Sequence, residues 1–301
     1  MLFSSVLSVF ALAVTSVSAH GYVSELKANG KTYKGPVAGG AKIQSPIRQI
    51  STTSPWKDVN GPGMTCGRGS QNAALVAPVT AGSTVELKWV DHPGTNWQHN
   101  MGPLITYMAK VPAGQTADKF NAAQGNFFKI AQAGQTGKSW VQASLMKGSS
   151  HSVTIPKELE NGDYIMRHEI IALHLANNKG GAEFYTSCIQ LRVTGGVSKM
   201  SVSPTAKFPG GYSASDPGIF TPKIFDGGFK YSFPGPAMPK FSSSGAASVK
   251  TSNNSSSTNA NVQSNTNSGS VKSKCRRAIS GWTSRMEKRF IGAPAAAPAA
   301  Q

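Results

Sequence analysis

The sequence predicts an all-β fold, an antiparallel β-sandwich with long loops, over residues 20–241. Short runs of β-branched and aromatic residues alternate with turn residues, and the chain contains 32 Gly and 18 Pro. One run, Thr84–Val90, alternates strictly between apolar and polar side chains. Convincing long segments with the period of an amphipathic helix are absent from residues 20–240. These three features together favour many short strands joined by turns.

Five segments carry the strand pattern, each bounded by turn residues. In chain order they are Thr84–Val90, Leu104–Val111, His151–Ile155, Tyr164–His174 and Glu183–Val193. Residues 30–82 hold few such runs although they lie inside the predicted domain. Long segments of this kind in a compact domain are usually functional surface or disordered.

Residues 1–19 have the pattern of a secretory signal peptide. They contain no charged residue and include the apolar run Val9–Val14, with small residues at Val17 and Ala19. Such a leader is cleaved after the small residue, and the apolar run is too short for a stable membrane anchor. We therefore expect a secreted, extracellular protein that begins at His20.

The C-terminal part has a different composition. Residues 242–270 are rich in Ser, Asn and Thr, which predicts a flexible linker, and they carry overlapping glycosylation sequons at Asn253 and Asn254. Residues 271–301 form a basic tail that we predict to be disordered. The alternative for residues 272–290 is a basic amphipathic helix for a wall or membrane surface.

The net charge is +17, with 30 Lys and Arg against 13 Asp and Glu. A positive protein is suited to an anionic surface or acidic polymer, but no nucleic-acid-binding motif accompanies the charge, so we expect no nucleic-acid partner. Solubility or cell-wall adhesion is the simpler interpretation. The low acid content also leaves few candidates for the paired carboxylates of a hydrolase.

The chain has three cysteines, Cys66, Cys188 and Cys275. In an oxidising compartment Cys66 and Cys188 are the natural pair, because both lie in the strand-rich part of the chain. Closing so long a loop stabilises a fold by about 5 kcal/mol in the chain-entropy account. Cys275 is then left over, either as a free thiol or in a bond between chains.

Cleavage after Ala19 gives His20 an α-amine and an imidazole on one residue, which is a bidentate metal chelate. Its expected partners are His99, in a loop that runs into a predicted strand, and Tyr185, on the same strand face as Glu183. Three nitrogen donors suit copper by ligand type and geometry. Because a free α-amine has a pKa of about 8 and must lose its proton to bind, affinity should fall in acid.

Other interpretations of these residues stay open. His20 is also consistent with an ordinary mature terminus, and His92 is an alternative second ligand. Tyr185 is alternatively a core tyrosine, and Trp56 and Trp97 are either core residues or sugar platforms. The segment HEIIALH from His168 fails as a zinc-protease signature, because Ala172 stands where that signature has its second histidine.

Several segments together resemble Auxiliary Activity family 9, the lytic polysaccharide monooxygenases formerly placed in glycoside hydrolase family 61. They are the mature His20-Gly21, the segment from His99 to Gly102-Pro103 followed by an apolar strand, RHEIIALH, FYTSCIQLRVTG and PGGYSASDPGI. The resemblance covers about residues 20–240 and leaves out the tail. It implies an immunoglobulin-like or fibronectin-like sandwich with a flat face that carries one copper ion per chain.

The resemblance also implies roles for individual residues. His20 and His99 correspond to the copper ligands and Tyr185 to the axial residue, while His174 corresponds to an outer-sphere histidine that positions oxygen. Glu183 stands where the family generally has glutamine, and a carboxylate donates a hydrogen bond only when protonated. Tyr212 corresponds to an aromatic residue of the substrate face. Cys66 and Cys188 correspond to a family disulfide.

The implied activity is oxidative cleavage of β-1,4-glucan, such as cellulose, by C–H hydroxylation at C1 or C4. Its partners would be dioxygen or hydrogen peroxide and an external electron donor, either a small reductant or a secreted dehydrogenase, with the enzyme acting as a monomer. The alternatives are a non-catalytic copper-binding protein and a wall-binding protein or glycosidase without a metal. The last of these predicts that a chelator has no effect.

Overall fold

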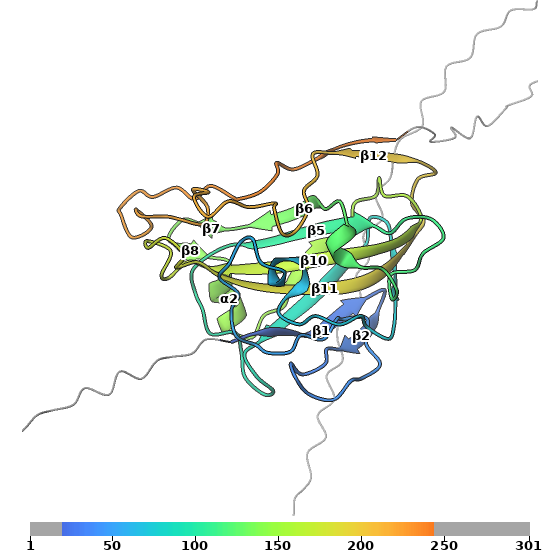
Figure 1. Cartoon of the computed structure of the whole chain (residues 1–301), viewed down its shortest axis with the longest axis horizontal. Coiled ribbons are helices and arrows are strands. Elements are labelled where there is room, and N and C mark those ends of the chain that lie inside the picture. The colour runs from blue at the N-terminus through green and yellow to red at the C-terminus, as the bar shows by residue number, and fades with distance from the viewer. Residues whose placement is uncertain (1–19, 244–301) are drawn as a thin grey trace, which may run out of the picture. The chain divides into compact units, whose positions relative to one another are not determined.

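Two β-sheets enclose the main hydrophobic core of residues 20–243, the part of the chain that the computed structural model describes (Figure 1). The predicted signal peptide, the sequons at Asn253 and Asn254, Cys275 and the basic tail lie outside the described residues, as does nearly all of the predicted linker. The all-β sandwich predicted from the sequence is confirmed. No helix within residues 20–243 is long and apolar enough to cross a membrane.

The larger sheet has five strands and the smaller one has four. In spatial order the five are β3 (Ala77–Thr80), β11 (Glu183–Thr194), β10 (Gly162–Ala172), β5 (Leu104–Lys110) and β6 (Phe128–Ala133). The four are β2 (Lys31–Lys34), β1 (Tyr22–Ala28), β4 (Thr84–Val90) and β9 (His151–Thr154). Neighbours pair antiparallel except β3 and β11, which run parallel.

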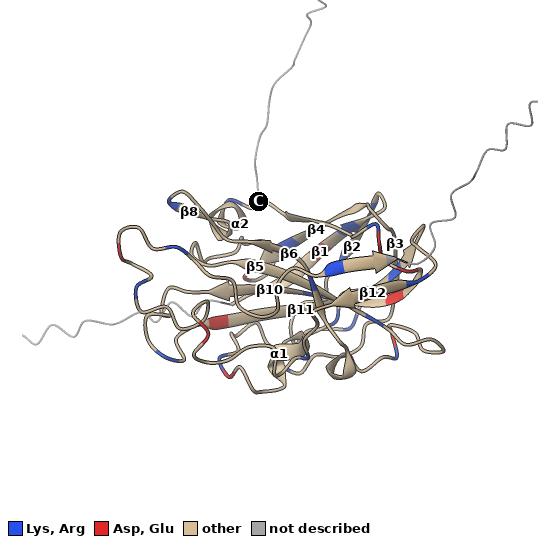
Figure 2. Cartoon of the chain, turned by 90° about the horizontal axis from the view of Figure 1, so that it is seen from above, with Lys and Arg blue, Asp and Glu red and all other residues tan. Residues whose placement is uncertain are grey.

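The remaining elements are short and lie in the connections. Two small antiparallel pairs are β7 (Gln135–Thr136) with β8 (Ser139–Trp140) and β12 (Met200–Ser203) with β13 (Lys240–Ser243). The helical elements are α1 (Gly63–Cys66), α2 (Gln142–Met146) and the 3₁₀ turn η1 (Ala122–Gln124). Figure 2 shows Lys and Arg spread over several strands and loops of this framework.

All five predicted strands are present, as β4, β5, β9, β10 and β11. The alternation in β4 has the expected effect, since Val85, Leu87 and Trp89 are buried while the polar residues between them are more exposed. Strand β10 ends at Ala172, two residues earlier than predicted. His174 therefore lies in the loop that follows the strand.

A second buried layer covers the outer side of the five-stranded sheet, where loops and α1 pack on β5, β10 and β11. At its centre Arg167 and Glu169 are fully buried and form an ion pair. The Tyr212 hydroxyl donates a hydrogen bond to Glu169 Oε2 at 2.6 Å, and the Tyr212 side chain is only 6% exposed. The expectation that Tyr212 is a substrate-face aromatic is therefore wrong, because its ring and hydroxyl complete this internal network.

Cys66 and Cys188 form a disulfide that joins α1 to β11 across 122 residues of sequence. Cys188 is fully buried, and its carbonyl accepts a hydrogen bond from Arg48 N. The predicted pairing is confirmed. It fixes the long segment that precedes β3 against β11 of the larger sheet.

Two histidines, His151 at the start of β9 and His168 within β10, stack on each other. The rings of His151 and His168 are 5.3 Å apart and nearly parallel, and His168 Nδ1 is 2.8 Å from Thr106 Oγ1. Burial lowers the pKa of His151 to about 4 and holds the pKa of His168 well below its ordinary value. Both rings are therefore neutral in the folded protein at neutral pH.

We expect the melting temperature to fall as the pH is lowered from about 6.5 towards 4. In that window the unfolded histidines bind protons that the folded ones reject, so protonation favours unfolding. Replacing one of the two imidazole rings, as in His151→Phe, should make the melting temperature fall less steeply as the pH is lowered. Calorimetric melting of both proteins across this pH range measures the effect, and equal slopes would contradict the assignment.

Candidate metal centre

Three potential metal ligands meet at one end of the sandwich. His99 lies in the loop between β4 and β5, His174 lies just after β10, and Glu183 opens β11. One ligand atom from each lies within 4.8 Å of the other two. The antiparallel pairing of β10 with β11 places the end of one strand beside the start of the other, with Ala172 opposite Glu183. The topology of the larger sheet thus brings these residues together.

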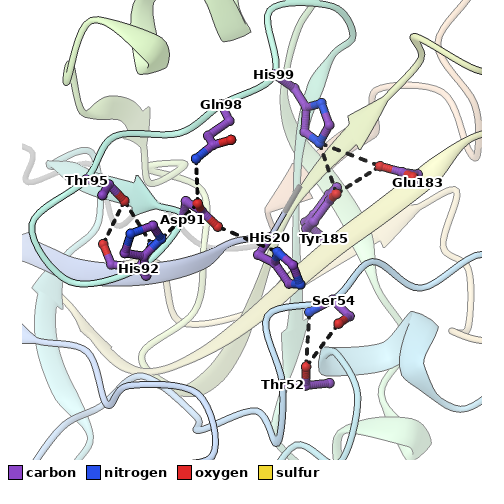
Figure 3. Close-up of polar contacts among 10 residues, drawn as sticks. All are labelled: His20, Thr52, Ser54, Asp91, His92, Thr95, Gln98, His99, Glu183 and Tyr185. Atoms are coloured by element: carbon purple, nitrogen blue, oxygen red, sulfur yellow. Dashed lines mark hydrogen bonds and ion pairs between the residues drawn. The ribbon is translucent and has the colours of Figure 1, made fainter. Parts of the chain in front are cut away.

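His99 is the most enclosed histidine of this cluster. Its Nε2 atom is 3.0 Å from the Tyr185 hydroxyl and 3.6 Å from Glu183 Oε2 (Figure 3). Its ring stacks on His174 at 4.5 Å. Burial, reinforced by the neighbouring His174, lowers the pKa of His99 to about 4. The ring is therefore neutral at physiological pH, which is the form that binds a metal.

Tyr185 connects the cluster to the hydrophobic core. Its hydroxyl donates to Glu183 Oε2 at 2.9 Å, and its ring packs edge-on against Trp97 at 4.8 Å. Burial, together with the Glu183 carboxylate, raises the pKa of Tyr185, so the phenol stays protonated. The ring is buried in the core, as one alternative expected, and the hydroxyl also faces the cluster.

Glu183 has a cationic neighbour that the sequence did not single out. Lys57 Nζ lies 3.2 Å from Glu183 Oε1. The preceding residue, Trp56, exchanges two backbone hydrogen bonds with Phe184, and this bridge places Lys57 beside the start of β11. Nothing in the sequence distinguishes Lys57 from the other basic residues. Only the fold identifies it.

His20 lies two residues before β1, where the chain passes directly over Trp97. A Cβ atom on Gly21 would lie 2.3 Å from the Trp97 ring, so only glycine fits after His20 without a shift. The His20 ring is 3.9 Å from Asp91 Oδ1 and is not part of the three-residue ligand cluster. In the 301-residue chain its α-nitrogen is also bonded to Ala19, so the chelate exists only after cleavage.

Asp91, the first residue of the loop that carries His99, lies between His20 and two other residues of that loop. Asp91 Oδ2 accepts a hydrogen bond from Gln98 Nε2 at 2.6 Å and lies 2.9 Å from His92 Nδ1 (Figure 3). The His92 side chain is 62% exposed and lies outside the ligand cluster. The structure therefore brings His99, and not the alternative His92, to His174 and Glu183.

The donor chemistry of this region fits copper. His99 offers a neutral imidazole, and Tyr185 adds a phenol oxygen next to it. His174 Nδ1 is buried and has no hydrogen-bond partner within the described residues, so it is a further nitrogen donor in this region. Nitrogen donors of this kind suit copper and zinc better than magnesium or calcium. Trp97 is a core residue here, 1% exposed, while Trp56 is partly exposed.

Comparison with known proteins places these observations in a family. The profile of Auxiliary Activity family 9 (formerly GH61) matches residues 20–230. AA9 family lytic polysaccharide monooxygenase D of Gloeophyllum trabeum is 46% identical over 71% of this chain, which spans 62% of that relative's length. AA9 family lytic polysaccharide monooxygenase F of Botryotinia fuckeliana is 40% identical over 68% of this chain and 87% of its own length.

Solved structures show the same similarity. A cellulose-active polysaccharide monooxygenase from M. thermophila is 30% identical, with a TM-score of 0.64 over 74% of this chain and 100% of its own. The extended catalytic domain of H. jecorina LPMO9A is 26% identical, with a TM-score of 0.65 over 76% of this chain and 96% of its own.

Proposed function

The chain belongs to Auxiliary Activity family 9, and on that premise we propose that it is a copper-dependent lytic polysaccharide monooxygenase that oxidatively cleaves β-1,4-glucan, such as cellulose, at C1 or C4. The observation that carries the proposal is the cluster of His99, His174, Glu183 and Tyr185 at the end of the sandwich. One relative is described as cellulose-active, which supports this substrate class.

In the proposed site the amine and imidazole of His20 and the imidazole of His99 would hold one copper ion, and Tyr185 would complete the set. Copper bound there would supply one-electron redox chemistry and a place for the oxygen co-substrate, dioxygen or hydrogen peroxide. The protein keeps His99 neutral and Tyr185 protonated by burying both. Neither residue then needs to release a proton before the ion binds.

His174 and Glu183 are proposed to act on the oxygen co-substrate from beside the metal. Glu183 Oε2 accepts from the Tyr185 hydroxyl and is 3.8 Å from His174 Nε2. The carboxylate therefore fixes the two rings relative to each other. Lys57 Nζ pairs with the second carboxylate oxygen of Glu183, Oε1, and balances the negative charge of the carboxylate. A glutamine at position 183 would be neutral and would not need this partner.

We further propose that the protein is secreted after removal of residues 1–19 and works as a monomer. It would receive electrons from an external donor, a small reductant or a secreted dehydrogenase. Residues 20–241 form the catalytic domain, with residues 242–270 as a linker that carries glycans on Asn253 and Asn254 and residues 271–301 as a basic tail.

The test is incubation of the secreted protein with cellulose and ascorbate, with products analysed by mass spectrometry. Oxidised oligosaccharides should appear, should disappear with a chelator and should return when copper is added. Ordinary reducing ends that are insensitive to the chelator would indicate a glycosidase. Stoichiometric copper binding without oxidised products would favour the non-catalytic alternative.

Glu183→Ala should lower the rate of glucan oxidation about 10- to 100-fold, the usual cost of losing a residue that orients metal ligands. Lys57→Met should lower it less, because it removes only the partner of Oε1. Initial rates with saturating copper measure both. Lys147→Met, an exposed lysine on the end of α2, is the matched control. Equal rates for Glu183→Ala and the unaltered protein would contradict the role.

A further inference from the structure

A pocket of about 590 Å³ lies beside α1, apart from the proposed copper ligands. Its walls come from α1 and the segments around it and from the turn at η1. The volume is within the range of small-molecule sites. The side chains that matter for its chemistry are Arg48, Trp56, Arg68, Ser70 and Asn121. None of the described residues that line the pocket carries a carboxylate.

Arg48 is a buried cation without a counter-ion. It is only 6% exposed, and its guanidinium donates to Gln190 Oε1, to the Ala117 carbonyl and to the Phe120 carbonyl. All three acceptors are neutral, and Arg48 forms no ion pair within residues 20–243. Burial lowers the pKa of Arg48 to about 10. A charge buried in this way is costly unless an anion compensates it.

Arg68 presents a second guanidinium to the same pocket. It lies over the Trp56 ring, 5.0 Å from the ring centre. The ring itself is fixed, because its Nε1 donates to the Asp58 carbonyl at 2.6 Å and the backbone at Gly63 leaves no room for a Cβ beside it. Trp56 therefore orients Arg68, as cation–π contacts do.

The pocket is rich in donors and poor in acidic groups. The Ser70 hydroxyl is buried and has no hydrogen-bond partner in the described part of the chain. Asn121 Oδ1 already accepts from Ala123 N, which leaves its amide N–H groups for a ligand. Asp58, two residues after Trp56, accepts a hydrogen bond from the backbone N–H of Asn60 through Oδ1. The chemistry therefore calls for an anion.

We propose that this pocket binds a uronic acid residue of an acidic polysaccharide, with the sugar carboxylate facing Arg48 and Arg68. A bare oxyanion is far smaller than the pocket, whereas a sugar ring uses the hydroxyl and amide groups as well. The identification as a sugar rests on the proposed function, while the preference for an anion does not. Lys57, next to Trp56 in the chain, contacts Glu183, so the pocket wall and the proposed copper site share one segment.

The experiment is calorimetric titration of the full secreted protein, both copper-loaded and chelator-treated. The ligands are a xylo-oligosaccharide that carries one glucuronic acid, the same oligosaccharide without the acid, and inorganic phosphate. The variants are Arg68→Gln, which removes the oriented cation, and Arg68→Lys, which keeps the charge but loses the planar fork. Lys147→Gln is the control for loss of one surface charge.

The acidic oligosaccharide should bind about 10-fold or more tightly than the neutral one, as expected for charge-assisted hydrogen bonds. Arg68→Gln should weaken it by a similar factor, Arg68→Lys by less, and Lys147→Gln not at all. Binding should be the same without copper, so it is separable from the oxidation assay. Equal binding of the two oligosaccharides, or no effect of Arg68→Gln, would overturn the proposal. Phosphate binding as tight as that of the acidic sugar would overturn its assignment to a sugar.

Discussion

A protein that keeps one alanine ahead of His20 is expected to lose high-affinity copper binding. The extra residue converts the α-amine into a peptide nitrogen and removes one of the three proposed nitrogen donors. Second-sphere changes at metal sites cost about 10- to 100-fold in affinity, and loss of a direct ligand should cost more. Substitution of His99 by alanine should have an effect of similar size.

Calorimetry and electron paramagnetic resonance of the copper complexes measure this prediction. His92→Ala is the control, because His92 is exposed and bound to Asp91 rather than to the ligand cluster. It should bind copper as the mature protein does. Unchanged affinity in the extended protein would refute the proposed ligand set, and loss of affinity in His92→Ala would favour the alternative ligand.

Removal of the disulfide should have the largest effect on stability. With Cys66 and Cys188 both changed to alanine, we expect the free energy of unfolding to fall by about 5 kcal/mol, because the bond closes a loop of 122 residues in the unfolded chain. Denaturant titration of the copper-free protein measures it. Cys275→Ser, which leaves the bond intact, should be neutral. A loss below about 1 kcal/mol would mean that the unfolded chain is already compact.

The fold was predictable where local pattern and burial agree. The five strands found in the sequence form most of the two sheets, because their apolar runs face the core. Strand β1 was missed because its Ser24, Glu25 and Lys27 make its alternation irregular, and a bulge shifts its pairing with β4. Strand β3 is only four residues long and contains Pro78, so its parallel pairing with β11 depends on tertiary contacts.

The proposed site was predictable in part. The motifs singled out His99, His174, Glu183 and Tyr185, and the structure brings these four together. Lys57 and Asp91 were missed, because each reaches the site through pairing between distant segments. Tyr212 shows the opposite error, since a motif suggested a surface role and the fold instead uses its hydroxyl to complete the buried Arg167–Glu169 pair.

The hydrogen bond between Asp91 and Gln98, together with the nearness of Asp91 to His20, has a kinetic consequence. One carboxylate, Asp91, thus lies against both the segment that carries His20 and the loop that carries His99. We therefore expect uptake of copper at the proposed site to require no slow rearrangement of the loop. The observed rate of loading should therefore rise in proportion to copper concentration without reaching a plateau, as for a receptor whose shape is already set.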